Sequence, residues 1–394
     1  MFCNFFKKIV KSELKEMIQN NHGIVYRGIQ MDNYKPLGGF RYQEYKDGTN
    51  IFKSIPSIQR KSDKVARVRR IHIREAMNRT WNAYLKYANG KDEFLPLKKE
   101  GLNKNGGIAT MLINSLDTLW LMKLHQEFND AKEWVRNNLF NHAVGVVSVY
   151  ETTLRNLGGL LSAYDLTSDK IFLSKADELG SRLIKTFDSP SGLPYAQTTL
   201  NTGRSFNVAS LQGNVLLAEI GSIQLEFRYL AKAVNKQIYA KKANKVFDVL
   251  ASMSAATPID GLLPSYIRNE VDPPTFGNNK ISLGENNNIS FYATLLKVYM
   301  QAGKYEHKYK RMYDRAVNSI TETLLHKSSP NGLTYVAEWV GGKIEHKMDA
   351  SVCSFAGTLA LGVHISRNQT GVNNSNAQRD LQNAKALAYT CYQM

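Results

Sequence analysis

The spacing of apolar residues along most of the chain predicts helices. Over residues 71–88 the apolar side chains are Ile73, Met77, Trp81, Tyr84 and Ala88, each three or four positions after the last, and Asn89-Gly90 follows as a helix stop. Similar spacing predicts helices over residues 108–125, 129–139, 149–165, 170–187, 210–233, 237–255, 287–302, 307–327, 349–364 and 377–394. Strand-like alternation is confined to an expected short hairpin at residues 332–347.

This pattern predicts an all-α fold of about eleven helices, many of them separated by glycine or proline. No repeat with a fixed period of about 20 to 50 residues is visible, which favours a closed barrel of helical hairpins over a solenoid. Residues 1–67 are polar and only weakly periodic, so we expect a poorly ordered N-terminal lead. No linker divides the chain after about residue 68, and residues 68–394 are expected to form one domain.

Composition and charge narrow the class of protein. A hydrophobic content of 43% is ample for a large core, and the net charge of +17 comes from 51 basic and 34 acidic residues. The lysines are scattered, and the densest basic run, residues 60–74, has no interleaved aromatics, so a solvated face is favoured over nucleic-acid binding. The sequence shows neither the ~18 to 20 consecutive apolar residues of a membrane span nor a secretory signal.

Cysteine usage gives one further indication. Cys3, Cys353 and Cys391 are too few and too far apart in sequence for a zinc site. Cys353 and Cys391 could pair with each other.

The stretch at residues 148–165 places Glu151 and Arg155 one helical turn apart in an otherwise apolar segment. Leu154, Leu157, Leu160, Leu161 and Tyr164 mark the side of this helix that packs. Gly158-Gly159 would permit close approach of a neighbouring helix or a ligand. Without other information, a half-covered structural ion pair is favoured over a catalytic site as the explanation of Glu151 and Arg155, because structural pairs outnumber catalytic carboxylates.

A second concentration of carboxylates lies in residues 211–228, where Glu219 and Glu226 are two helical turns apart. The structural alternative is that Glu226 pairs with Arg228 or with a neighbouring helix. Motifs of metalloproteases, serine hydrolases and nucleotide-binding proteins are absent from the sequence. Carboxylates along the axis of a helical barrel suit glycoside hydrolysis, in which one group protonates the leaving oxygen and another activates water.

Several segments together resemble glycoside hydrolase family 47, the class I α-1,2-mannosidases. They lie in the family's order at residues 74–96, 110–124, 127–135, 148–166, 221–230 and 347–362, and the chain ends on a matching TCYQM. The resemblance implies an (α/α)7 barrel that removes α-1,2-linked mannose from high-mannose N-glycans with inversion. It also implies a calcium ion that holds sugar hydroxyls.

The resemblance assigns roles to individual positions. Glu151 matches the family's acid and Arg155 its positioning partner, while three further carboxylates fall on substrate-site positions: Glu219, Asp117 and Glu338. Cys353 and Cys391 match the family's disulfide cysteines, a pairing typical of an oxidising lumen.

The chain also departs from the family pattern. The second catalytic aspartate is replaced by Ile289, or by Asn288 in a shifted alignment, and neither can take a proton at neutral pH. Asn114 and Ala350 replace a further aspartate and a histidine. The sequence ends before the family's last helices, which carry a catalytic glutamate and the calcium-binding threonine, so the barrel is expected to be incomplete and to have no protein ligand for calcium.

The sequence therefore predicts a mannosidase of family 47 that acts on high-mannose N-glycans in the lumen of the endoplasmic reticulum or Golgi, as a monomer with little or no activity. The alternatives are a glycan-binding protein without catalysis and a gene fragment without independent function. Asn78, Asn288, Asn368 and Asn373 begin N-glycosylation sequons. We expect the region around Asn288 to be mobile or irregular.

Overall fold

The computed structural model describes residues 56–140, 143, 145–367 and 375–394. The chain divides into two compact units: the first holds Met1–Gly145 with Arg155–Ala176, and the second holds Val146–Leu154 with Asp177–Met394. The expected N-terminal lead over residues 1–67 lies outside the described residues except for its last twelve positions, which form the start of a helix.

In the first unit, helices pack beside one short hairpin. Its elements are α2 (Pro56–Ala88), β1 (Glu93–Leu95), β2 (Glu100–Leu102), α3 (Thr110–Leu121), α4 (His125–Asn138) and α6 (Gly158–Thr167), with the start of α7 (Lys170–Leu183). Helix α2 begins at Pro56, earlier than the residue 71 predicted from apolar spacing. Its basic first half is rich in lysine and arginine, which favour helix without contributing to an apolar pattern.

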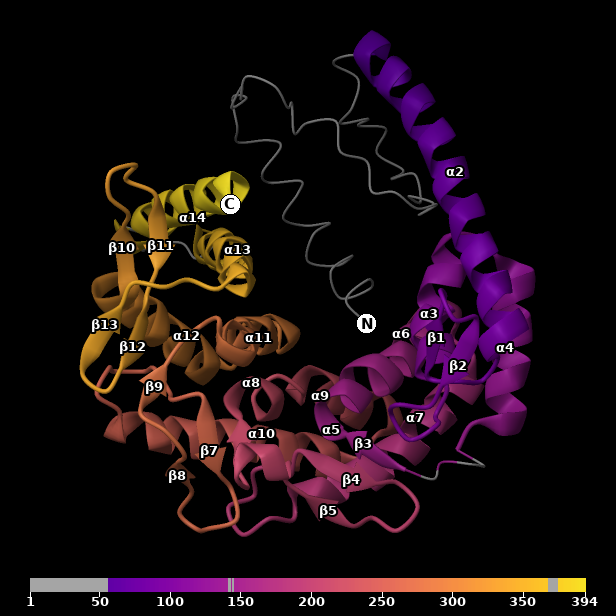
Figure 1. The fold of residues 1–394 in the computed structure, drawn as a ribbon, viewed down its shortest axis with the longest axis horizontal. Coiled ribbons are helices and arrows are strands. Elements are labelled where there is room, and N and C mark those ends of the chain that lie inside the picture. The colour runs from indigo at the N-terminus through magenta and orange to yellow at the C-terminus, as the bar shows by residue number, and fades with distance from the viewer. Residues whose placement is uncertain (1–55, 141–142, 144, 368–374) are drawn as a thin grey trace. The chain divides into compact units, whose positions relative to one another are not determined.

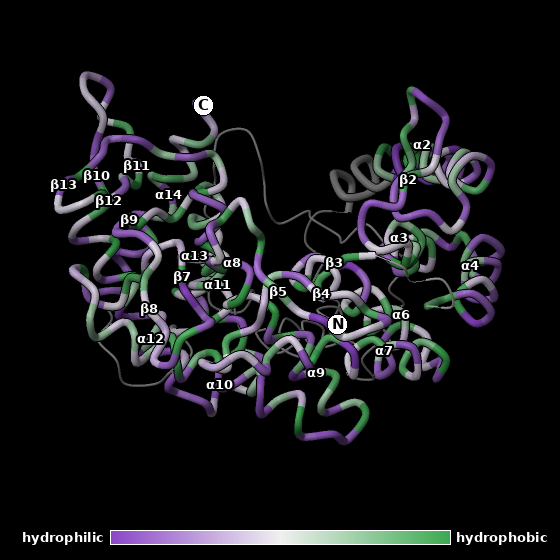
Figure 2. The backbone as a smooth tube through the Cα atoms, turned by 60° about the horizontal axis from the view of Figure 1, so that its bottom comes forward, coloured by the Kyte–Doolittle hydropathy of each residue, from purple (hydrophilic) through white to green (hydrophobic). Residues whose placement is uncertain are grey.

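Two features of the first unit follow directly from its sequence. Along α4, purple hydrophilic turns alternate with green hydrophobic ones (Figure 2), and the buried residues are Phe128, Ala131 and Val135. Helices α3 and α6 approach closely at Gly159, where an added Cβ would lie 2.9 Å from the carbonyl oxygen of Ile113. The close approach predicted for the glycine pair is thus confirmed, and its partner is a helix.

In the second unit, long helices alternate with short strands. The helices are α5 (Val149–Glu151), the end of α7, α8 (Leu217–Ile220), α9 (Gln224–Val234), α10 (Gln237–Met253), α11 (Ile289–Gln301), α12 (His307–Ser319), α13 (Ser354–Arg367) and α14 (Ser375–Gln393). The strands are β3 (Val146–Ser148), β4 (Gln197–Thr199), β5 (Ser205–Phe206), β6 (Val215–Leu216), β7 (Tyr266–Arg268), β8 (Thr275–Phe276), β9 (Lys280–Ile281), β10 (Leu325–Lys327), β11 (Thr334–Val336), β12 (Glu338–Val340) and β13 (Lys343–Glu345). They form the small antiparallel sheets β3-β4-β5, β6-β7-β8, β9-β12-β13 and β10-β11.

The long helices of the second unit pair as hairpins: α9 with α10, α11 with α12, and α13 with α14. Helix α11 also contacts α8, α9 and α13, so alternate helices lie side by side in one layer (Figure 1). Most of α11 is apolar and buried, whereas α12 buries only one face, which includes Tyr309, Tyr313 and Val317. This is the helix-on-helix layering of an all-α fold, as predicted.

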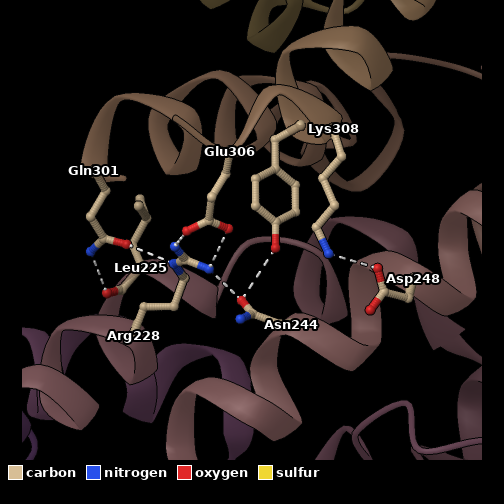
Figure 3. A network of polar contacts seen from close by, with 8 residues as sticks. Leu225, Arg228, Asn244, Asp248, Gln301, Glu306 and Lys308 are labelled. Atoms are coloured by element: carbon tan, nitrogen blue, oxygen red, sulfur yellow. Dashed lines mark hydrogen bonds and ion pairs between the residues drawn. The ribbon is translucent and has the colours of Figure 1, made fainter. Parts of the chain in front are cut away.

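Arg228 on α9 joins three helices of this unit (Figure 3). Its guanidinium donates to Glu306 at 2.5 Å, to Asn244 at 2.5 Å and to Gln301 at 3.1 Å. Gln301 in turn donates to the carbonyl oxygen of Leu225 at 2.9 Å. Because the arginine is mostly buried and its partners lie on different elements, this network fixes how α9, α10 and the end of α11 meet.

Several predicted helix boundaries were wrong. The hairpin expected at residues 332–347 is confirmed as β12 and β13, but the other strands were not predicted because two or three residues are too few to show alternation. Residues 210–233 were expected to form a single helix but instead form β6, α8 and α9. Residues 307–327 were also expected to be one helix, but the last three of them form strand β10.

Cys353 and Cys391 form a disulfide with their Cα atoms 5.9 Å apart, as predicted. The bond joins the turn that precedes α13 to the last turns of α14. Cys3 lies outside the described residues. Within the described ranges, none of the helices has the length and apolar character needed to cross a bilayer.

Candidate active site

Glu151 stands where a strand turns into a helix. The Ser148 hydroxyl accepts a hydrogen bond from the Glu151 N–H at 3.2 Å, which caps the first turn of α5. The N–H of Val149 donates to the carbonyl oxygen of Ala196 at 2.9 Å and ties this turn to the chain before β4. The backbone of Glu151 is therefore held from both sides, and its side chain is half-buried.

The helix after Glu151 is irregular. Residues Thr152–Leu157 form a π-helical turn between α5 and α6, where a regular α-helix was predicted. Thr152 and Thr153 are fully buried, and the Thr153 hydroxyl donates to the Val149 carbonyl at 2.7 Å. A threonine that bonds to the preceding turn competes with the regular helical ladder, and π-turns inside α-helices are frequent at functional sites.

Glu219 lies in α8, a single turn that follows β6. The helix stops at Gly221, where an added Cβ would meet the ring of Phe291 at 2.5 Å. Ser222 donates to the Ala218 carbonyl at 2.5 Å and lies 2.9 Å from the hydroxyl of Ser290 on α11. The close fit against α11 fixes the position of α8 and explains why a continuous helix through Glu219 and Glu226 does not form.

Glu151 and Glu219 lie near each other within the second unit. Burial and, to a smaller extent, the negative charge of Glu151 together raise the pKa of Glu219 to about 7. The two carboxylates are thus neighbours, and their roles toward a sugar stay predictions. A carboxyl group that is partly protonated near neutral pH can both donate and accept a hydrogen bond.

Asp117 and Arg155 belong to the first unit. Asp117 is half-buried on α3, where its carboxylate accepts a hydrogen bond from the Ser162 hydroxyl on α6 at 2.9 Å. Asn114, one turn earlier on α3, is exposed. Arg155 is an exposed residue of the π-helical turn. That Asp117 and Arg155 contact a sugar stays a prediction.

The side chain of Glu338 is bound by other side chains of this chain. Its side chain is almost fully buried at the start of β12, where it accepts a hydrogen bond from the Ser282 hydroxyl at 2.7 Å. The Lys280 ammonium lies 3.1 Å from its other oxygen and 3.6 Å from Glu285. Lys280, Ser282 and Glu285 were not identified from the sequence, because no motif or spacing distinguishes them. This carboxylate is part of an internal polar network.

The sequence suggested a structural role for Glu226, in which it pairs with Arg228 or with a neighbouring helix, and this is confirmed in part. Burial raises its pKa to about 7, and its own backbone N–H and the charge of Lys297 oppose this rise. Lys297 lies on α11, so the opposite charge comes from a neighbouring helix. The suggested pairing with Arg228 is wrong, because Arg228 binds Glu306 instead.

The positions expected to hold a second catalytic carboxylate are occupied by the buried residues Ile289 and Asn288. Ile289, the first residue of α11, is buried, and its N–H donates to the Leu283 carbonyl at 2.8 Å. Asn288 is 1% exposed, and its amide donates to Ser265 at 2.7 Å and to the Ser282 carbonyl at 3.0 Å. The region around Asn288 is irregular, as expected, because Asn286 and Asn287 just before α11 have positive φ values of 49° and 60°. Asn288 itself is buried, which argues against its use as a glycosylation acceptor.

The fold is all-α, and Glu151 and Glu219 supply two neighbouring carboxyl groups of the kind that glycoside hydrolysis uses. Residues 76–394 match the profile of glycosyl hydrolase family 47. The chain is 36% identical over 334 residues to the mannosyl-oligosaccharide 1,2-α-mannosidase MNS1 of Arabidopsis thaliana, covering 84% of this chain and 57% of that protein. It is 37% identical over 324 residues to the rat endoplasmic reticulum mannosyl-oligosaccharide 1,2-α-mannosidase, covering 81% of this chain and 46% of that protein. The chain belongs to glycosyl hydrolase family 47.

A solved structure gives the same result. The α-1,2-mannosidase from Trichoderma reesei superposes with a TM-score of 0.71 at 25% identity, covering 82% of this chain and 67% of that one. The resemblance to family 47 and its helical fold are thereby confirmed. The chain spans about half the length of the curated relatives it matches.

Proposed function

We propose that this chain binds terminal α-1,2-linked mannose of high-mannose N-glycans at Glu151 and Glu219, and that it hydrolyses this linkage very slowly. The observation that carries the proposal is the pair of neighbouring carboxylates in a member of a family whose named relatives are 1,2-α-mannosidases. The relatives' names supply the substrate class. The carboxylate pair supplies groups that can bind it.

The two carboxylates suit a neutral, hydroxyl-rich ligand. With a pKa of about 7, Glu219 is protonated in part of the molecules at neutral pH and can donate to a sugar oxygen. A carboxyl oxygen of Glu151 can accept a hydrogen bond from a sugar hydroxyl beside it. If Glu151 also protonates the leaving oxygen, as the family resemblance implies, the site contains the acid of an inverting glycosidase.

Slow hydrolysis follows from the positions of Ile289 and Asn288. Inversion requires a second carboxylate, about 6.5 to 9.5 Å from the first, that activates water on the opposite face of the sugar. The buried isoleucine cannot accept a proton, and the Asn288 amide is already committed to Ser265 and Ser282. Loss of such a group costs about 10²- to 10⁴-fold in rate.

The proposal does not depend on a calcium ion. A calcium ion takes six to eight oxygen ligands at short distance. In the part of the chain that the structure describes, no three His, Cys, Asp or Glu side chains are grouped so that they could hold a metal. No step of the proposed reaction is assigned to calcium.

The proposed setting is the lumen of the endoplasmic reticulum or Golgi, with the chain as a monomer. Disulfides persist in oxidising compartments, which supports this setting through Cys353 and Cys391. Relatives from rat and mouse are named as endoplasmic reticulum enzymes.

The test combines binding and turnover on the purified chain with calcium present. Binding of a high-mannose N-glycan by calorimetry is expected to weaken by roughly 10- to 100-fold in Glu219→Ala, because a hydrogen bond to a charged or buried group is lost. Exposed Glu133→Ala on α4 is the control and should bind normally. No binding by the unaltered chain would refute the proposal. Clear mannose release that Glu151→Gln abolishes would refute slow hydrolysis.

A further inference from the structure

Two histidines that are 20 positions apart in the sequence meet beside the β10-β11 hairpin. His326 is the middle residue of β10, and His346 directly follows β13. Their ring centroids lie 5.2 Å apart, and the two rings are nearly perpendicular, at 86°. His326 is half-buried and His346 is exposed, so solvent reaches the pair. Neither histidine has a role in the glycan site proposed above.

Each ring is held through one of its two nitrogens. The Nε2 of His326 lies 3.2 Å from the carbonyl oxygen of Thr323, to which an Nε2–H can donate. The Nδ1 of His346 lies 2.7 Å from the hydroxyl oxygen of Tyr335, which pairs with His326 across the hairpin. When these two nitrogens donate their protons, the lone pairs of His326 Nδ1 and His346 Nε2 stay available to a ligand.

The spacing of the two rings matches that of two ligands of one metal ion. Imidazoles bound to a tetrahedral ion, with metal–nitrogen bonds of about 2.0 to 2.1 Å, have ring centroids roughly 5 Å apart. The observed separation is 5.2 Å. Histidines that bind metals also use their second ring nitrogen for a hydrogen bond that fixes the ring. The contacts with Thr323 and Tyr335 supply this support.

From this geometry, we propose that His326 and His346 together bind one divalent transition-metal ion of the class of Zn²⁺ and Cu²⁺. Imidazole nitrogen suits these ions, whereas calcium takes oxygen ligands, so this site is distinct from the calcium site that the family resemblance implies. Among the described residues, no group of three His, Cys, Asp or Glu side chains could hold a metal, so water would complete the coordination. The bound ion would join β10 to the end of β13.

An anion is the main alternative ligand, because Lys327 and Lys347 follow the two histidines in the sequence. Lys327 lies on the other face of β10, since adjacent side chains of a strand alternate. An anion between the rings would also require both imidazoles to be protonated, and two positive rings 5.2 Å apart repel each other. Neutral rings that share a cation avoid this repulsion.

The experiment is calorimetric titration of Zn²⁺ into the purified full chain, without an affinity tag and with Cys3→Ala so that this thiol does not compete. One ion per chain is expected. Tyr335→Phe keeps the ring but removes the hydroxyl, and should weaken binding by about 10-fold. Loss of a ligand should cost more, so His326→Ala and His346→Ala should each weaken binding by about 10²-fold or more.

The matched control is His72→Ala, which removes an exposed histidine near Glu75 on α2 and should bind Zn²⁺ normally. Zn²⁺ should raise the melting temperature of the unaltered chain and of this control, but not that of His326→Ala/His346→Ala. Electron paramagnetic resonance with Cu²⁺ should show two imidazole nitrogens, which the double variant loses. Circular dichroism should show all variants folded.

Three results would overturn the proposal: no Zn²⁺ binding by the unaltered chain, equal binding by the double variant, or a Cu²⁺ spectrum without imidazole nitrogen. Tighter binding of inorganic phosphate than of Zn²⁺, lost in the same variants, would identify an anion site instead.

Discussion

Glu219 lies close enough to Glu151 for the negative charge of Glu151 to raise its pKa, in addition to the larger effect of burial, to about 7. The two residues come from different elements, the first turn of α5 and the single turn of α8. Neither turn is long, and each follows a short strand that sets its direction. The position of this carboxyl pair therefore depends on the strand-to-helix junctions at β3 and β6.

The raised pKa predicts how stability depends on pH. Glu219 binds its proton more tightly in the folded chain than in the unfolded one, so its contribution is complete below about pH 4.5 and is lost as the pH rises to about 7. Chemical unfolding at pH 5 and pH 8 should show that Glu219→Gln reduces this loss by on the order of 2 kcal/mol. Equal pH dependence in the variant and the unaltered chain would contradict the assignment.

Replacing the neighbour tests the origin of the shift. Glu151→Gln removes the repelling charge and leaves burial in place, so the pKa of Glu219 should fall but stay above its ordinary value of 4.5. The measurement is a titration of the Glu219 carboxyl by infrared or NMR spectroscopy. Glu133→Gln, at an exposed position on α4, should leave the titration unchanged.

Sequence spacing predicted the helices well because most of them bury a single face. Helices α10 and α12 show this, and their predicted starts at residues 237 and 307 agree with the structure. The turns around Glu151 and Glu219 could not be predicted in the same way. A π-turn arises from buried threonines, and the break at Gly221 from contact with Phe291 on α11, neither of which is visible in apolar spacing.

Asn288 shows a second limit of sequence reasoning. Its sequon suggests a glycosylation site, but glycosylation needs an exposed asparagine, and Asn288 is 1% exposed. We predict that, when the chain is expressed through a eukaryotic secretory pathway, Asn288→Gln leaves its electrophoretic mobility unchanged before and after endoglycosidase treatment. The same comparison with Asn78→Gln controls for sequon use at a partly exposed position. A mobility shift that depends on Asn288 would show that this region opens.

The disulfide is predicted to stabilise the last two helices. Cys353 and Cys391 are separated by 38 residues, and closing a loop of this size stabilises by about 3 to 5 kcal/mol. Cys353→Ala/Cys391→Ala should lower the free energy of unfolding by this amount, with the largest loss of amide protection in α13 and α14. Cys3→Ala is the control. Full stability of the double variant would show that the packing of α13 against α14 is sufficient.

Asp92 organises the loop that leads into α3, although no sequence pattern identifies it. It is 2% exposed, and its carboxylate accepts hydrogen bonds from the backbone N–H groups of Asn105, Gly107, Ile108 and Thr110 at 2.8 to 3.2 Å. Because both carboxylate oxygens accept hydrogen bonds, a side chain with one acceptor oxygen would leave some of these donors unsatisfied. The position of Asp117, farther along the same helix, depends on this anchor.

Asp92→Ala should therefore destabilise the chain by at least about 3 kcal/mol, since two buried and two partly buried backbone N–H groups lose their acceptor. Asp92→Asn retains one acceptor oxygen and should lose less. The measurement is chemical unfolding together with hydrogen exchange at Ile108 and Thr110, whose amides should lose protection before those of α10. Asp130→Ala, at an exposed position on α4, should cost no more than about 0.5 kcal/mol. If Asp92→Ala keeps both its stability and the protection of these amides, the loop is held by its own turns and α3 does not depend on the carboxylate.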